Sequence, residues 1–170
     1  MVSEMVFDYC DSPLGPLLLA AGGQGLAHVD LPHEARPTVP RPDWRRDRAA
    51  LAEARRQLRA YFDGQAFGFT VKIKPHGTPF QLAVWAALRD IPCGQTTSYG
   101  EIARRIGRPR AVRAVGAANG ANPLAIIVPC HRVIGADGSL TGYGGGLPAK
   151  QWLLAHERRH APVAALELRA

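Results

Sequence analysis

The sequence has few cysteines, and none of them forms a CxxC pair. Only Cys10, Cys93 and Cys130 occur among 170 residues. An odd and sparse set of this kind cannot complete a disulfide framework and does not indicate structural zinc. We therefore expect reduced thiols, no metal site and no cofactor.

Long apolar runs are also missing. Apolar runs such as residues 17–21 and 125–128 are far shorter than the roughly 20 residues of a membrane-spanning helix. Glu4 and Asp8 stand where a secretory signal would carry basic residues followed by an apolar run. A transmembrane protein is excluded, and we expect a cytoplasmic protein with no membrane partner.

Acidic residues are scarce only in the C-terminal part. Residues 1–70 hold eight Arg and nine acidic residues, a net charge of −1, whereas residues 71–170 hold thirteen basic and five acidic residues, a net charge of +8. A basic region of this kind favours a polyanion such as nucleic acid, because neutralising phosphates releases counterions. A solvated basic surface is an equally good interpretation of the charge alone.

The N-terminal part predicts a small antiparallel sheet with one helix. Short apolar runs at 5–9, 17–21 and 26–31 are separated by Gly and Pro turns, which indicates a meander. Residues 48–62 have apolar side chains at helical spacing and end at a glycine: Leu51, Ala54, Leu58 and Phe62, then Gly64. Residues 67–73 alternate like a further strand, and a domain boundary is expected between residues 74 and 75.

The C-terminal part predicts several short helices. Thr78, Pro79 and Gln81 have the spacing of a capping box that opens a helix to about Arg89. A second box, from Ser98 to Glu101, opens a helix through Ile106. After a Gly-containing turn a further helix is expected from Arg110 to about Asn119, which completes a helix-turn-helix. Residues 125–128 read as a buried strand and 149–158 as a last helix.

The second helix of this motif is almost bare of bulky side chains. Arg110 and Arg113 are three residues apart and are therefore expected to share a face, and the rest is rich in Ala and Gly. Only these two arginines and Asn119 could read base edges. The pattern favours DNA binding by shape and backbone, in the minor groove and with little sequence preference. Tight helix packing is the structural alternative.

Cys130 and His131 follow the predicted buried strand. A thiolate is the reactive form of cysteine, and a neighbouring histidine can take the thiol proton. Three cysteines and six histidines would give such a dipeptide by chance about one time in ten, so the pair alone is a weak signal. A buried structural thiol is the alternative.

Three surrounding features strengthen the pair. Asn122 before Pro123 imposes an extended entry to the strand. Residues 141–146 form a Gly-rich loop with one aromatic ring, either a lid or a simple connector. Glu157 can orient His131, although a surface carboxylate paired with Arg158 is the alternative.

These residues together closely resemble one family, the O6-alkylguanine-DNA alkyltransferases. The matching motifs are Pro129-Cys130-His131-Arg132-Val133-Ile134, Ser98-Tyr99, Arg113-Ala114-Val115-Gly116, Asn122-Pro123, Gly142-Tyr143-Gly144-Gly145 and Leu153-Leu154 to Glu157. Residues 11–15 also resemble the start of the family's first domain. The resemblance implies an α+β protein with a ribonuclease H-like domain at 1–74, a winged-helix-like helical domain at 75–160 and a tail at 161–170.

The resemblance also implies a role for each matching residue. Cys130 would be the alkyl acceptor, and His131, through a water, and Glu157 would generate its thiolate. Asn122 would order the active-site backbone. The remaining roles concern DNA and the base pocket: Tyr99 as proton donor to the departing guanine, Arg113 as filler of the gap in the base stack, Arg110, Ala114 and Gly116 as DNA contacts, and Tyr143, Gly144 and Gly145 as pocket lining.

The reaction implied is direct reversal of DNA damage. A thioether offers water no acyl group to attack, so each molecule should act once. The target oxygen lies inside the duplex, so the base must leave the stack at a cost of a few kcal/mol. We expect double-stranded DNA carrying O6-alkylguanine as partner, with O4-alkylthymine an open second substrate, and a monomer whose clustering on DNA is also open.

Two other classes remain open. A helix-turn-helix DNA binder with an inert Cys130 would leave the thiol unmodified. A cysteine hydrolase using Cys130 and His131 would turn over repeatedly and ignore DNA, although the basic C-terminal part argues against it. Cys93 is expected to be structural.

Overall fold

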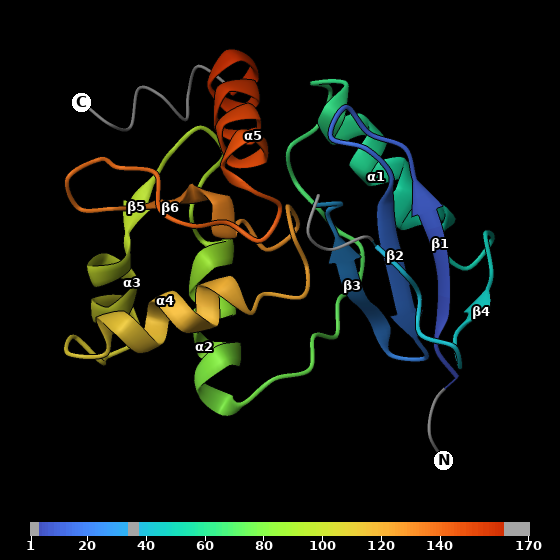
Figure 1. Cartoon of the computed structure of the whole chain (residues 1–170), viewed down its shortest axis with the longest axis horizontal. Helices are drawn as coiled ribbons and strands as arrows, with labels where there is room; N and C mark the ends of the chain where they lie inside the picture. The colour runs from blue at the N-terminus through green and yellow to red at the C-terminus, as the bar shows by residue number, and fades with distance from the viewer. Residues whose placement is uncertain (1–3, 34–37, 162–170) are drawn as a thin grey trace. The chain divides into compact units, whose positions relative to one another are not determined.

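Two units, residues 1–76 and 77–170, make up the chain in the computed structural model, which describes residues 4–33 and 38–161 (Figure 1). The division falls two residues after the predicted boundary. Apart from Ala161, the predicted tail at 161–170 lies outside the described residues.

The first unit contains a four-stranded sheet in the order β3-β2-β1-β4. The predicted antiparallel meander is confirmed as β1 (Val6–Cys10), β2 (Leu17–Gly22) and β3 (Gly25–Asp30). The sequence did not predict β4 (Arg45–Arg46), which pairs parallel to β1 and makes the sheet mixed. Two arginines carry no apolar alternation, so this strand depends on its partner alone.

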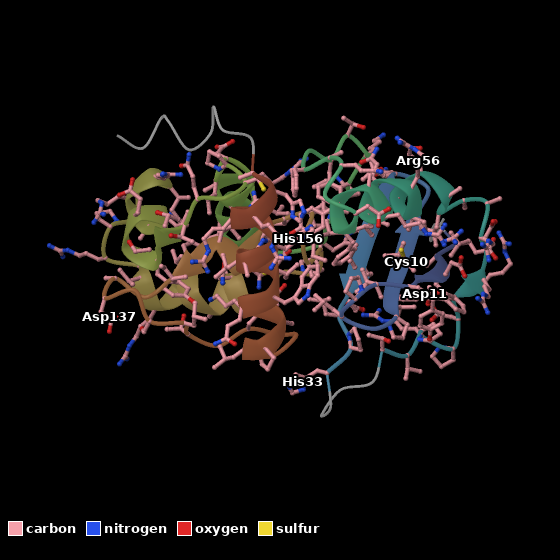
Figure 2. All side chains as sticks on the ribbon, turned by 90° about the horizontal axis from the view of Figure 1, so that it is seen from above. Cys10, Asp11, His33, Arg56, Asp137 and His156 are labelled. Carbon is pink, nitrogen blue, oxygen red and sulfur yellow. The ribbon has the colours of Figure 1, made fainter. Side chains whose placement is uncertain are left out.

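One helix, α1 (Ala52–Phe62), packs beside this sheet. It begins later than predicted because the Asp47 carboxylate accepts a hydrogen bond from the Ala50 N–H and holds a turn there. Arg55 of the helix and Asp8 of β1 form an ion pair with 3.7 Å between Nε and Oδ2. Cys10 also lies in the sheet of this unit (Figure 2) and is fully buried.

The predicted strand at 67–73 is wrong. The side-chain oxygen of Gln57 accepts hydrogen bonds from the N–H groups of Thr70 and Val71. A side chain thus takes up donors that a strand partner would use. Within the described residues the segment forms one isolated bridge, between Leu26 and Ile73.

The second unit is built around three packed helices, α2 (Pro79–Arg89), α3 (Tyr99–Arg105) and α4 (Val112–Gly120). The capping box of Thr78 and Gln81 is confirmed in both directions. At Ser98 only half of the predicted box is present: Ser98 accepts from the Glu101 N–H, while the Glu101 carboxylate pairs with arginines of its own helix.

The predicted buried strand at 125–128 is wrong as well. The segment is buried but forms consecutive turns, closed by bonds from Val128 N–H to Leu124 carbonyl and from Ile127 N–H to Ala125 carbonyl. Ile126 has a φ of 73°, a left-handed conformation that is costly for a β-branched residue. An apolar run alone does not distinguish a strand from a buried turn.

A parallel pair, β5 (Thr97–Ser98) and β6 (Val133–Ile134), joins the start of α3 to the segment after Cys130. The last helix, α5 (Leu147–His160), is longer at both ends than predicted; it begins after Gly146, whose φ is 88°. Figure 2 marks His156 on this helix. No helix in the described ranges is long and apolar enough to cross a membrane.

Candidate active site

Cys130 is the first residue of a short 3-10 helix, η1 (Cys130–Arg132), in the second unit. The side chains of this helix point into the protein: Cys130 is 6% exposed and His131 is fully buried. The backbone after η1 continues into β6, whose pairing with β5 fixes its position. The thiol is therefore held on a backbone that has little freedom to move.

His131 and Glu157 come from segments 26 residues apart and meet inside the unit. The His131 Nε2 atom lies 2.7 Å from Glu157 Oε1, and both side chains are fully buried. Burial rules out the alternative of a surface carboxylate. The structure thus brings together two residues that the sequence placed in one relay.

Arg132 is a buried partner of Glu157, a role that the sequence alone did not indicate. Its Nε and one Nη each donate to a different Glu157 oxygen at 2.8 Å, and its other Nη donates to the Ile91 carbonyl at 2.6 Å. Bidentate guanidinium–carboxylate pairs are among the strongest hydrogen bonds in proteins. The carboxylate that faces His131 is therefore fixed in orientation.

The charges of Glu157 and Arg132 influence the protonation state of His131. Burial alone would raise the pKa of Glu157, but the interactions with His131 and Arg132 hold that pKa well below its usual range. Burial lowers the pKa of His131, and the charges of Arg132 and Lys150 lower it further against the opposing effect of Glu157. A neutral imidazole that donates from Nε2 to an ionised Glu157 leaves Nδ1 as an acceptor.

That Nδ1 atom is buried and has no hydrogen-bond partner among the described residues. Buried polar atoms are normally satisfied, so an unpaired ring nitrogen on the residue that follows Cys130 in the chain suits proton transfer. Burial raises the pKa of Cys130, while a hydrogen bond from Asn122 and the charge of Lys150 lower it in part. The resting group is a thiol, and it requires a base to become reactive.

Asn122 organises the backbone before the cysteine. Its Nδ2 donates to the Val128 carbonyl at 2.8 Å, and its Oδ1 accepts from the Leu124 N–H at 3.0 Å. The same amide contacts the thiol. This one side chain therefore fixes both the turns at 124–128 and the sulfur atom.

Lys150 is a second residue that the sequence did not point to. It is fully buried on α5, and its Nζ donates to the carbonyls of Val133 and Thr141 at 2.7 and 3.2 Å. Burial lowers its pKa, and the proximity of Cys130 opposes that shift. A buried ammonium at this place favours negative charge on the sulfur.

The Gly-rich loop contributes two side chains to the site. The Tyr143 hydroxyl is buried without a hydrogen-bond partner in the described part of the chain, and burial, followed by the nearby Cys130 and Glu157, raises its pKa well above the usual value. Thr141 Oγ1 lies 2.5 Å from the Tyr99 hydroxyl on α3. A Cβ at Gly144 would meet nothing within 4 Å, so this part of the loop borders open space.

The helix-turn-helix presents small side chains to solvent. Arg113 and Ala114 are exposed on α4, and a Cβ at Gly116 would lie 3.9 Å from the Tyr99 ring. Arg110 is exposed too, but it lies in the turn before α4, so the two arginines do not share a helix face as predicted. The glycine places Tyr99 directly beside the recognition helix.

Asn119 does not read base edges, contrary to the sequence-based expectation. It is buried, and its Nδ2 donates to the Cys130 carbonyl at 3.4 Å. Its position in the last turn of α4, facing the core, explains why it is unavailable to DNA. The recognition helix is thus joined directly to the backbone of the reactive residue.

Cys93 and Cys10 differ from Cys130 in their surroundings. Burial, followed by the charge of Glu157, raises the pKa of Cys93 to about 12. Burial also raises the pKa of Cys10, which lies in the other unit. Neither thiol adjoins a histidine base in the sequence. Among the described residues, no group of three or more His, Cys, Asp or Glu side chains could hold a metal ion.

A ribonuclease-like unit followed by a helix-turn-helix unit with a buried Cys-His-Glu site defines a class of DNA alkyltransferases. Residues 5–75 match the ribonuclease-like domain of 6-O-methylguanine DNA methyltransferase, and residues 79–159 match its DNA-binding domain. The chain belongs to this family.

Particular relatives are similar over nearly their whole length. The methylated-DNA–protein-cysteine methyltransferase of Methanosarcina barkeri is 52% identical over 157 residues, which cover 92% of this chain and 99% of the relative. The protein of that name from Mycobacterium tuberculosis H37Rv is 53% identical over 153 residues, 90% of this chain and 92% of the relative.

Solved structures agree in fold. The M. tuberculosis O6-methylguanine methyltransferase structure has a TM-score of 0.85 at 50% identity, covering 98% of this chain and 99% of that one. The M. tuberculosis OGT structure in complex with DNA has a TM-score of 0.84 at 51% identity, covering 96% and 99%. The predicted α+β fold and its two domain types are confirmed.

Proposed function

We propose that this chain repairs O6-alkylguanine in double-stranded DNA by moving the alkyl group onto the sulfur of Cys130. The observation that carries this assignment is the buried sequence of contacts from Arg132 to Glu157 to His131, next to a thiol that needs a base. Relatives named methylated-DNA–protein-cysteine methyltransferases support the reaction class.

The chemical step is one displacement at carbon. The Cys130 proton passes through a bridging water to His131 Nδ1, and Glu157 stabilises the imidazolium that forms. The sulfur attacks the alkyl carbon, a carbon–sulfur bond forms, and the bond from that carbon to O6 breaks. Tyr99 supplies a proton to the departing guanine and regains one from water, while His131 releases to water the proton that it took from Cys130. The products are unmodified guanine and an S-alkylated protein.

DNA is bound through α4, and the damaged nucleotide enters the site from the duplex. Exposed Ala114 and the adjacent Gly116 permit close approach to a minor groove, and Arg110 contacts the backbone. Arg113 fills the space that the flipped base leaves. Tyr143, Gly144 and Gly145 form the base pocket. A weakly paired, damaged guanine lowers the cost of flipping, which adds energetic selection for lesions.

Under this proposal each protein molecule reacts only once. Because the thioether has no route back to a thiol, the molar amount of repaired lesion equals the amount of protein consumed. We place this activity in the cytoplasm and in a monomer, with no cofactor. O4-alkylthymine would be a second substrate if the pocket accepts a pyrimidine.

Intact-mass measurement after incubation with a duplex carrying O6-methylguanine tests the assignment. We expect one added methyl group per protein molecule, mapped to Cys130, with repair that stops when the protein is consumed. Cys130→Ser should bind the duplex without gaining mass, and Cys93→Ser should behave like the unchanged protein. Repair by an unmodified protein would contradict the proposal, and so would repeated turnover.

The same experiment separates the two other classes. A plain DNA binder would hold the duplex and leave both the lesion and the protein mass unchanged. A cysteine hydrolase would release product from an ester repeatedly and show no dependence on the lesion. In either case Cys130 would not carry a stable thioether.

A further inference from the structure

A cavity of about 570 Å³ lies in the first unit, far in sequence from the reactive cysteine. Its walls come from the turn between β2 and β3, from the loop that carries Arg41 and Trp44, and from Lys74 to His76. The described lining residues all belong to residues 1–76. We refer to it as the N-terminal cavity.

The charged side chains that line the N-terminal cavity are basic or imidazole groups. Arg41 and Lys74 are exposed cations, and His28 and His76 add two rings; among the described residues, no carboxylate lines the cavity. Neither Arg41 nor Lys74 forms a salt bridge within the described ranges. Burial lowers the pKa of His28, and the charges of Arg41 and His76 lower it further.

An aromatic group stands beside these cations. The rings of His28 and Trp44 are 5.2 Å apart between centroids at an angle of 40°, and the Arg41 guanidinium carbon lies 5.6 Å from the Trp44 centroid. Trp44 is only partly buried, so part of the indole borders the cavity. Aromatic rings interleaved with cations are typical of sites that bind bases and phosphates together.

The size of the N-terminal cavity indicates a ligand larger than a single phosphate group. A volume near 570 Å³ falls among small-molecule sites and exceeds what one phosphate group fills. Glycines at 22, 23 and 25 leave the wall between β2 and β3 without bulky side chains. The ligand must therefore offer an anionic end for the cations and a larger, flat part for the rest.

We propose that the N-terminal cavity binds a nucleotide unit, with its phosphate at Arg41 and Lys74 and its base beside Trp44 and His28. The unit is either a free nucleoside phosphate or one nucleotide of a DNA strand, since both present the same chemistry. This site is separate from the alkyl-transfer site and does not depend on Cys130.

Calorimetric titration of the full chain tests the proposal with four probes: pyrophosphate, adenosine diphosphate, adenosine triphosphate and a short unmodified oligothymidylate. We expect saturable binding of the nucleotides with a change in tryptophan fluorescence that Trp44→Phe abolishes. Arg41→Ala combined with Lys74→Ala should weaken binding at least about tenfold, because two charge-assisted contacts are lost. Arg48→Ala, an exposed arginine of the same unit outside the cavity, should leave affinity unchanged.

The relative affinities of the four probes show whether the bound nucleotide is free or part of a DNA strand. Tighter binding of the nucleoside phosphates points to a free nucleotide, and tighter binding of the oligothymidylate, lost in the Arg41 and Lys74 double variant, points to a DNA strand. Equal affinity for pyrophosphate and adenosine diphosphate would overturn the proposal, as would equal nucleotide affinity in the double variant and the unchanged protein. Transfer from free O6-benzylguanine, unaltered in the double variant, verifies folding independently of the cavity.

Discussion

Arg132 donates hydrogen bonds to both carboxylate oxygens of Glu157, at 2.8 Å each, while His131 contacts one of the same oxygens at 2.7 Å. The three residues form a buried cluster in which the arginine compensates the charge of the glutamate. A histidine oriented by an ionised carboxylate can accept a proton without leaving an unpaired charge. Arg132 is therefore a positioning residue that acts through Glu157.

Arg132→Met tests this relationship. Removing one partner of a buried ion pair costs about 3–5 kcal/mol, so we expect a lower free energy of unfolding by denaturant. We also expect alkyl transfer at least about tenfold slower, since the pKa of Glu157 rises and His131 loses its orientation. Arg132→Lys should restore only part of the rate because an ammonium cannot bind both oxygens in one plane. A normal rate in a stable Arg132→Met protein would contradict the positioning role.

Lys150→Met should change how the reaction depends on pH. The ammonium lowers the pKa of Cys130, so its loss raises that pKa and reduces the fraction of thiolate at neutral pH. We expect transfer from free O6-benzylguanine about tenfold slower near pH 7, with recovery at higher pH. The measurement is the rate as a function of pH, with the exposed Lys72→Met as control. An equal loss at every pH would mean that Lys150 only holds the backbone at Val133 and Thr141.

The sequence pointed to the reactive groups of the proposed reaction but not to the buried basic residues that the structure places around them. Cys130 and His131 are adjacent, and their motif is specific, so they could be found directly. Arg132 and Lys150 act through the carbonyls and carboxylate of distant segments, such as Ile91 and Glu157. No spacing rule indicates that a basic side chain in a basic region is buried.

The fold was predictable where local signals were strong. The capping box at Thr78 and the turns between β1, β2 and β3 depend on interactions between residues close in sequence, so they can be predicted from residue types alone. The errors at 67–73 and 125–128 share another cause. In each case a side-chain amide, from Gln57 or Asn122, bonds backbone groups of a segment that the apolar pattern assigned to a strand.

Thr141→Val should affect the reaction only through Tyr99. The two hydroxyl oxygens lie 2.5 Å apart, so valine removes the bond and frees the tyrosine hydroxyl. We expect a loss of about 0.5–1.5 kcal/mol of transition-state stabilisation, measured as the rate of duplex repair. In a Tyr99→Phe background the same change should cost almost nothing, as a double-mutant cycle would show. Additive losses would mean that Thr141 acts elsewhere, for example on the Gly-rich loop.

Arg113→Ala should separate base flipping from chemistry. The side chain is exposed on α4, away from the buried relay, so we expect an unchanged rate with free O6-benzylguanine. Duplex repair should be at least about tenfold slower, because nothing then offsets the few kcal/mol of unstacking. Equal losses on both substrates would contradict the gap-filling role.

Arg110→Ala provides the matched control for that comparison. Arg110 lies in the turn before α4 and is expected to contact phosphate. Its loss should weaken duplex binding and reduce the salt dependence of affinity by about one phosphate contact, while the flipping step is unaffected once the DNA is saturating.

Asp30→Asn should stabilise the first unit in a pH-dependent way. Burial raises the pKa of Asp30 to about 6, and the charge of Arg41 opposes that shift only in part. A carboxyl whose folded-state pKa lies above its unfolded-state value is neutral in both states at low pH, and it costs stability as pH rises through the folded-state pKa. The full cost, up to about 3 kcal/mol at pH 7 and above, should be absent below pH 4.

Denaturant unfolding of Asp30→Asn and of the unchanged protein across this range measures the difference, with the exposed Asp11→Asn as control. A gain of equal size at pH 4 and pH 8 would show that the amide improves packing and that the carboxyl's ionisation is not the cause.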